Sequence, residues 1–258
     1  MRRQIGLPLA ALAIAALASM PCRAEEVEEP RFEVYTGANY DGRTGNVASS
    51  LNWGVFNPVT QSGFRLKLDG LADIYGVSNA PLSSTDSGLK YVTDVMAGYQ
   101  FEYGPAWIKL YAGAAYGEQA AIGTTFNGIY HVETPQRKAW GAAAAFQSYW
   151  PMSDRVWASL NVTWLQPNSL TSIYSRGAYD IYRTEGGLRI SAGAETSFSL
   201  TGEPTIKQGW AFEKYVQAGA LLNLRYGRND LSLSGGLSQP GGEAGSHLYA
   251  GISYGRQF

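Results

Sequence analysis

The sequence has little of what most soluble enzymes and helical membrane proteins require. Charged residues are 16% of the chain, against about 25% in ordinary soluble domains. Its single cysteine is Cys22. Beyond residue 24 there is no cysteine, and no apolar run of about 18 residues that would suit a membrane-spanning helix. These absences exclude a disulfide framework, a thiolate metal centre and a helical inner-membrane protein.

The first 24 residues read as a leader rather than as part of the fold. Met1-Arg2-Arg3 is a short basic region, residues 7–20 are almost wholly apolar, and Cys22-Arg23-Ala24 ends in a small residue. This order is typical of a secretory signal peptide. We therefore expect cleavage after Ala24, a short tail over 25–30 and one folded domain over 31–258.

Glycine and aromatic residues are abundant. The chain has 31 glycines in 258 residues and 13% aromatics, whereas glycine averages about 7% in proteins. Together with few charges and a signal peptide, this composition favours an outer-membrane β-barrel. The net charge of −1 provides no basic surface, so we expect no nucleic-acid partner.

Apolar residues recur at every second position over most of the chain. In residues 64–68, Phe64, Leu66 and Leu68 alternate with Arg65 and Lys67. A period of two predicts strands. A soluble sandwich would bury the apolar set, whereas a membrane barrel would turn it to lipid and the charges to a lumen. Alternation alone does not separate these two architectures.

Twelve segments have the alternation expected of strands. Most are about 10 to 14 residues long, which suits tilted membrane-spanning strands of about 9–11 residues or more. Soluble strands are shorter, with a mode of about 5–6 residues. The predicted strands are 31–40, 47–56, 63–75, 89–102, 106–116, 138–149, 155–165, 172–182, 187–198, 210–225, 230–238 and 247–258.

The connections between these segments favour the barrel. Most even-numbered segments are followed by tight turns and odd-numbered ones by longer loops, notably 76–88, 117–137 and 199–209, with 166–171 as a short exception. Short turns at one end and long loops at the other are typical of transmembrane barrels. We predict a closed antiparallel barrel of twelve strands whose first and last strands pair. Ten or fourteen strands stay open, because strand boundaries shift by about two to four residues.

The tryptophans mostly lie near predicted strand ends, which favours interfacial girdles over the alternative of a sandwich core. These tryptophans are Trp53, Trp107, Trp140, Trp150, Trp157, Trp164 and Trp210.

The alternation also predicts which charged side chains face the lumen. Seven basic and seven acidic residues do so, whereas a ring of one sign is typical of an ion-selective pore. The balance favours pairing across a narrow lumen. The alternative is a polar track for a neutral sugar, with Tyr99, Trp107, Tyr111 and Trp157 as stacking surfaces. The predicted lumen charges are Glu33, Arg65, Lys67, Asp69, Lys90, Asp94, Glu102, Lys109, Arg176, Asp180, Arg189, Glu195, Glu213 and Arg225.

Signals for catalysis are weak. The two histidines are His131, in a predicted loop, and His247, at the start of the last segment. Ser246 precedes His247, but adjacency in sequence says little about the geometry that a nucleophile and its base require. We find no nucleophile motif of the G-x-S-x-G type and no cluster of metal ligands. We expect a non-enzymatic protein without cofactor or metal, and keep an outer-membrane hydrolase as a third hypothesis.

Several strands resemble the cellulose biosynthesis protein BcsS family of proteobacteria. The similar stretches are Val95–Gln100, Trp107–Gly113, Gly187–Glu195, Leu224–Gly227 and Leu231–Gly236. The resemblance extends over 31–258. The chain departs from the family pattern at Ala194, where proline is expected, and in the long region 117–137.

The resemblance implies an outer-membrane protein tied to cellulose production, and no site residues carry over from it. We expect an accessory role, a monomer in outer-membrane lipid, and cellulose or other cellulose-export components as partners. The alternative is a small-solute channel unrelated to cellulose.

Overall fold

The computed structural model describes residues 29–42, 44–77, 86–124, 130–131, 137–205, 209–240 and 245–258. The predicted signal peptide over 1–24 lies outside these residues, as does the tail except for residues 29 and 30.

Strands make up nearly all of the described chain. The exception η1 (Pro167–Ser169) is a single short turn of 3₁₀ helix. Within the described residues, no helix has the length and apolar character of a membrane span. The strands are β1 (Phe32–Tyr40), β2 (Thr44–Gly54), β3 (Gly63–Val77), β4 (Asp86–Tyr103), β5 (Ala106–Thr124), β6 (Tyr130–His131), β7 (Arg137–Pro151), β8 (Val156–Leu165), β9 (Leu170–Arg183), β10 (Arg189–Thr205), β11 (Gly209–Tyr226), β12 (Asn229–Pro240) and β13 (His247–Gln257).

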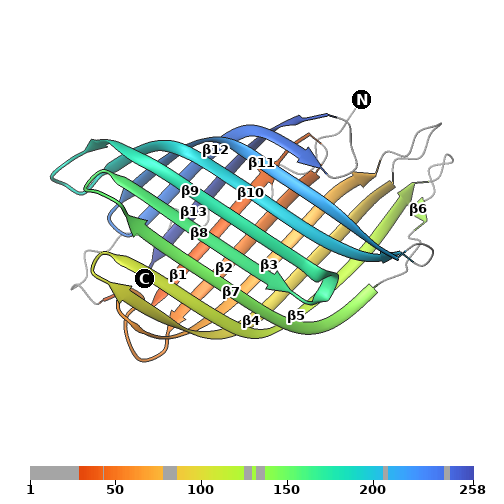
Figure 1. The fold of residues 1–258 in the computed structure, drawn as a ribbon, viewed down its shortest axis with the longest axis horizontal. Helices are drawn as coiled ribbons and strands as arrows, with labels where there is room; N and C mark the ends of the chain where they lie inside the picture. Colours follow the sequence, from red (N-terminus) through yellow and green to blue (C-terminus); the bar gives the residue numbers. More distant parts are fainter. Residues whose placement is uncertain are drawn as a thin grey trace.

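Twelve of the described strands close into one antiparallel barrel, in which the strands run obliquely around the wall (Figure 1). The two-residue β6 only pairs with the end of β5. The first and last strands pair from Glu33↔Gln257 to Tyr40↔Ala250. The lipid environment requires this closure, because each backbone group without a hydrogen bond in a bilayer raises the free energy by several kcal/mol. The predicted fold, strand number and closing pair are confirmed.

The pairing register sets one continuous inner face. Glu33 lies opposite Asn52, Asn52 opposite Lys67, and Lys67 opposite Met96. Residues directly opposite in an antiparallel pair point to the same side of the sheet. The inward residues therefore form one continuous surface from strand to strand, which is largely polar and includes the buried Met96.

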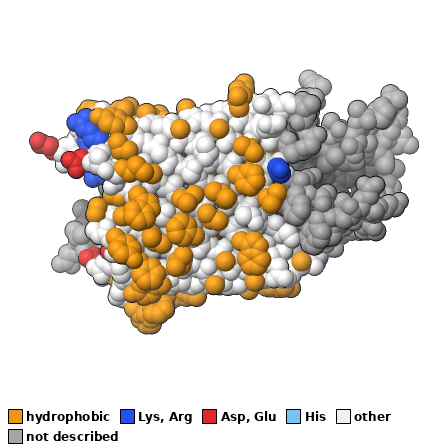
Figure 2. All heavy atoms as spheres, in the orientation of Figure 1, with side chains coloured by type: hydrophobic (Ala, Val, Ile, Leu, Met, Phe, Trp, Pro, Cys, Tyr) orange, Lys and Arg blue, Asp and Glu red, His pale blue; other side chains and the backbone are white. Residues whose placement is uncertain are grey.

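The outer face is an apolar band. On β5 the outward positions from Ala106 to Tyr116 are all uncharged, and the same holds on β11 from Val216 to Tyr226. Each stretch is about 11 residues long, the length that a tilted strand needs to cross the hydrocarbon core. Figure 2 shows apolar side chains over the described wall on the face in view, with charged side chains at its margins. The band therefore has the height of one bilayer.

Two ends of the barrel are distinguished by their connections. The turn end carries 55–62, 104–105, 152–155, 184–188 and 227–228. The chain ends of the barrel meet there too, since the Arg31 amide donates to the Phe258 carbonyl at 2.6 Å. We call the opposite end the loop end.

Some of the predicted loops at the loop end are strand. β5 continues to Thr124, and β10 continues to Thr205 before β11 begins at Gly209. The prediction of loops over 117–137 and 199–209 is therefore wrong for much of each range. Cross-strand pairing continues past the apolar band, as between Glu203 and Ala211. The alternation of apolar residues does not signal such pairing.

The girdle prediction holds for only part of the tryptophans. Those on the outer face lie at both ends of the apolar band, whereas two lie on the inner face, where the prediction is wrong. The side chain of Trp210 lies outside the described residues. Trp53, Trp140, Trp150 and Trp164 are outward and exposed, and Trp107 and Trp157 are inward.

A charge in the middle of the outer band should destabilise the barrel. Leu222 lies on the outer face near the middle of the band on β11. We expect Leu222→Arg to lower the free energy of unfolding by about 2–4 kcal/mol, measured by urea titration in lipid vesicles. Leu248→Arg, at the loop end of β13, should cost at most about 1 kcal/mol. Equal costs at the two sites would contradict a bilayer around this wall.

Candidate functional site

Hydrogen bonds across the lumen identify the inner face directly. Lys109 on β5 donates to Glu33 on β1 over 2.8 Å, although three strands separate β1 from β5 along the wall. At the other side, Tyr249 on β13 donates to Glu195 on β10 over 3.1 Å. Contacts between strands that are not neighbours in the sheet pass through the interior of a barrel. The lumen is therefore crossed by polar side chains.

The structure places most of the predicted lumen charges on this inner face. Arg65, Lys67, Lys90, Asp94, Lys109, Asp180, Glu195 and Glu33 are buried there, Asp69, Glu102, Arg176 and Arg225 are partly buried, Arg189 is exposed at the turn end, and the Glu213 side chain lies outside the described residues.

One cluster joins the start of β1 to β5. Glu33 accepts hydrogen bonds from Lys109 at 2.8 Å and from Gln257 at 3.2 Å. The Lys109 ammonium lies 4.5 Å from the centre of the Trp107 ring. Both charged residues are at least 95% buried. Burial of an ion is unfavourable unless a partner and further hydrogen bonds compensate it, and this cluster supplies both.

The connection between β2 and β3 is held from inside the barrel. Arg65 donates to the Pro58 carbonyl at 2.8 Å, and Gln100 donates to the Val59 carbonyl at 3.1 Å. Arg65 and Gln100 are each 1% exposed. The segment 55–62 therefore covers these two side chains at the turn end. The alternation in the sequence does not predict this contact.

Two carboxylates face each other on β3 and β4, closer to the loop end than Arg65 and Gln100. Asp69 on β3 lies directly opposite Asp94 on β4, and like charges in that position repel. Lys67 pairs with Asp69. One side-chain oxygen of each carboxylate is buried without a hydrogen-bond partner. The equal numbers of inward acidic and basic residues predicted from the sequence therefore do not give every acidic side chain a basic partner beside it.

A second cross-lumen cluster is centred on Arg176. Its guanidinium lies 3.4 Å from Glu195 and donates to Ser232 and Ser253, each at 3.3 Å. Those serines belong to β12 and β13, so Arg176 reaches from β9 across the interior. The small side chains on β12 and β13 leave room for it.

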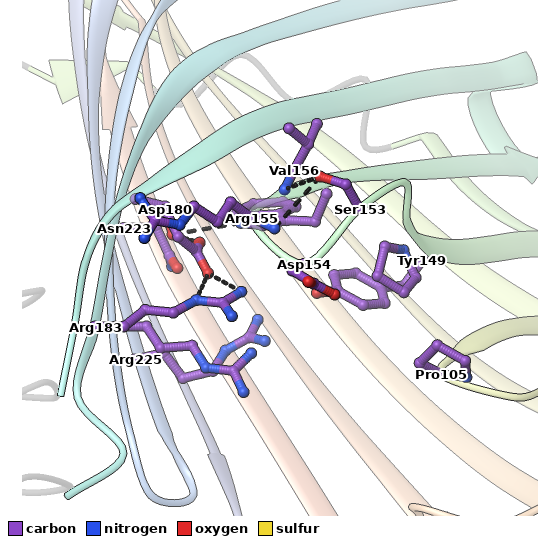
Figure 3. Close-up of a pocket in the computed structure, with 14 residues that line it drawn as sticks. Pro105, Tyr149, Ser153, Asp154, Arg155, Val156, Asp180, Arg183, Asn223 and Arg225 are labelled. Atoms are coloured by element: carbon purple, nitrogen blue, oxygen red, sulfur yellow. Dashed lines mark hydrogen bonds and ion pairs between the residues drawn. The ribbon is translucent and has the colours of Figure 1, made fainter. Parts of the chain in front are cut away.

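At the turn end the inner wall opens into a cavity of about 340 Å³, which we call the vestibule (Figure 3). Its charged lining is four arginines and two aspartates, and its apolar lining includes Tyr149 and Trp157. The charged residues are Arg155, Arg183, Arg189, Arg225, Asp154 and Asp180.

A β-bulge builds part of this vestibule. Asp180 pairs with Ser191 and Arg183 with Arg189, so the register shifts by one residue between them. In a regular strand, residues three apart point to opposite faces, whereas an extra residue lets both face the lumen. Arg183 consequently forms an ion pair with Asp180 at 2.5 Å. Strict alternation would put Arg183 on the outer face, so the sequence pattern does not predict its position in the vestibule.

Arg155 marks the rim of the vestibule in the turn between β7 and β8. Its guanidinium donates to the Tyr179 hydroxyl at 3.3 Å. This hydrogen bond raises the pKa of the Arg155 side chain above its ordinary value. Arg155 is therefore cationic at any physiological pH.

The predicted stacking residues do not form one surface. Tyr99 lies on the outer face against Phe64, with ring centres 5.2 Å apart, so its assignment to the lumen is wrong. Trp107 and Trp157 do face inward and flank Tyr149, at ring distances of 6.1 and 6.0 Å. Tyr111 is also inward, where its hydroxyl donates to Asn52. The aromatic row that exists is Trp107–Tyr149–Trp157.

The residues considered for catalysis lie at the loop end. Ser246 is exposed in a connection, and the His247 backbone carbonyl accepts a hydrogen bond from Ser238. The backbone of His131 belongs to β6, and its side chain lies outside the described residues. In the described part of the chain, no group of three or more histidine, cysteine or acidic side chains could hold a metal ion.

The ion pair between Glu33 and Lys109 gives a testable energetic coupling. We expect Lys109→Met to lower the free energy of unfolding by about 3–5 kcal/mol, since it leaves a buried carboxylate without its partner. Glu33→Gln together with Lys109→Met should cost clearly less than the sum of the single changes. A double-mutant cycle from urea titrations measures this coupling, and strict additivity would show that the two residues do not interact.

Comparisons with known proteins find barrels of the outer-membrane type. No family model and no curated protein matches the chain. Solved structures that resemble it include the β domain of the Bordetella autotransporter BrkA, with 12% identity and a TM-score of 0.44 over 90% of this chain and 100% of that one. The NanC porin is similar at 9% identity and a TM-score of 0.39, covering 88% and 100%. The transport unit of the Escherichia coli autotransporter AIDA-I has 11% identity and a TM-score of 0.38, covering 97% of each chain.

Proposed function

We propose that this protein is a non-enzymatic barrel of the bacterial outer membrane that assists cellulose biosynthesis or export. The uncharged outer band, one bilayer high, supports a place in outer-membrane lipid. The link to cellulose is supported by the resemblance of Val95–Gln100, Trp107–Gly113 and Gly187–Glu195 to the BcsS family. These stretches form parts of β4 and β5 and the start of β10, and contribute Lys109 and Glu195 to the lumen.

The observation that carries an accessory role, rather than that of a conduit, is the crossing of the lumen by buried charged side chains. Near the turn end Lys109 and Glu33 join β5 to β1, four positions away around the wall, and Arg176 spans the interior between β9 and β13. A glucan chain that threaded the barrel would have to separate such pairs, at about 3–5 kcal/mol for each broken buried pair. We infer that the polymer passes elsewhere and that this barrel acts beside it.

Deletion of the gene tests the cellulose role. We expect the deletion strain to make less cellulose or fibrils of altered form, scored by dye binding and electron microscopy. Unchanged polymer and fibrils would overturn the proposal. Complementation with the double variant Ser246→Ala, His247→Ala should restore cellulose as fully as the unaltered gene does, because the proposed role needs no nucleophile or base. Failure of this variant, at equal protein level, would favour a hydrolase.

A second candidate is a small-solute channel, favoured by the vestibule that opens at the turn end. The Arg176 side chain would then limit the bore beyond it, since it reaches across the barrel to Ser253. In this case the channel serves solutes that are unrelated to cellulose.

Planar-bilayer recording tests the channel. If the lumen conducts, Arg176→Ala should raise the unitary conductance severalfold, because it removes a side chain that crosses the interior. Lys138→Ala is the matched control, since Lys138 lies on the outer face and is half exposed. No unitary conductance at any voltage, in either the unaltered protein or the Arg176 variant, would eliminate this candidate.

A further inference from the structure

Three arginines form a row across the inner wall of the vestibule. Arg189 on β10 lies directly opposite Arg183 on β9 and directly opposite Arg225 on β11. Like charges in such positions destabilise a sheet. In Figure 3 the guanidinium groups of Arg183 and Arg225 lie near each other on one side of the vestibule. An arrangement of this kind needs negative charge close to it.

Among the described residues, the ion pairs of this row are made by the two flanking arginines. Arg183 pairs with Asp180 at 2.5 Å, and Arg225 pairs with Asp230 at 2.9 Å. The central Arg189 is exposed and lines the vestibule, and among the described residues its side chain has no hydrogen bond or ion pair. Arg189 interacts electrostatically with Asp180, but that carboxylate already binds Arg183 and the Ser191 hydroxyl. The middle of the row is therefore short of an anion.

The vestibule also has the size and the apolar wall of a small-ligand site. Its volume of about 340 Å³ lies within the range of about 300–1,000 Å³ that is usual for ligand pockets. Tyr149 and Trp157 line it next to the arginine row. Aromatic rings of this kind pack against the apolar face of a ring-shaped ligand while hydroxyl groups reach water.

We propose that the vestibule binds a small anionic solute, a monosaccharide that carries one carboxylate or one phosphate. Arg189 holds the anionic group with the two parallel N–H donors of its guanidinium, a geometry that suits both groups. Arg183 and Arg225 add positive potential from either side. Asp154, at the rim, and Asp180 oppose a ligand of higher negative charge. This inference rests neither on the cellulose role nor on conduction.

Calorimetric titration of the refolded barrel in neutral detergent tests the site. The probes are glucuronate for the carboxylate, glucose 6-phosphate for the phosphate, and neutral glucose and inorganic phosphate as references. We expect at least one anionic sugar to bind at least tenfold more tightly than glucose and than inorganic phosphate, and to bind more weakly as salt concentration rises. The stronger of the two sugars identifies the anionic group.

Arg189→Gln should weaken binding of that sugar at least tenfold. Arg189→Lys keeps the charge but loses the paired donors, so its affinity should lie between those of the unaltered protein and Arg189→Gln. Arg256→Gln is the matched control, because Arg256 lies at the same end of the barrel but outside the vestibule, over the Phe258 ring. It should bind as the unaltered protein does.

Thermal unfolding provides a second readout that also reports folding of each variant. The anionic sugar should raise the melting temperature of the unaltered barrel, because a ligand of the native state stabilises it. The Arg189→Gln variant should fold and should lose this response. Equal binding of glucose and the anionic sugars, tighter binding of inorganic phosphate, or an unchanged affinity in Arg189→Gln would each overturn the proposal.

Discussion

The need to pair every backbone group in a medium without water governs this structure. Twelve antiparallel strands meet that need only as a closed ring, and the ring is completed by β1 against β13, whose paired residues include Glu33 and Gln257. Once the sheet is closed, each side chain faces either the lipid outside or the lumen inside. The alternation along each strand then sends apolar groups to lipid and polar groups inward.

The inward-facing charged side chains need partners within the protein, because the narrow interior excludes bulk water. Ion pairs such as Glu33 with Lys109, and Arg176 with Glu195, supply the compensating charge, and the first of them joins strands that are not neighbours in the wall. Polar side chains in this barrel thus link strands up to four positions apart around the wall. The exceptions are Asp69 and Asp94, which face each other, and the arginine row at the turn end, where the wall opens to solvent.

Much of the fold could be predicted because one simple pattern, a period of two with alternating connection lengths, reflects the environment directly. The strand number, the closing pair and the inner position of residues such as Lys67 and Lys109 follow from it. What it missed depends on local departures from regular pairing. The bulge near Ile181 turns Arg183 inward, and the anchoring of Val59 by Gln100 depends on contacts far apart in sequence. Strands that continue beyond the apolar band, as β10 does to Thr205, lack the alternation of apolar residues there, so their ends could not be predicted.

The link between Val59 and the barrel has a consequence for assembly. The Val59 amide donates to the Pro30 carbonyl, just before β1, and the neighbouring Arg31 amide donates to Phe258 at the end of the chain. A segment from the first quarter of the chain is therefore fastened at the seam where synthesis starts and finishes the ring. Contacts between residues so distant in sequence form slowly. The pairing of β1 with β13 should therefore be the last part of the wall to form, and the segment around Val59 should not be fixed in place until that pairing closes the ring.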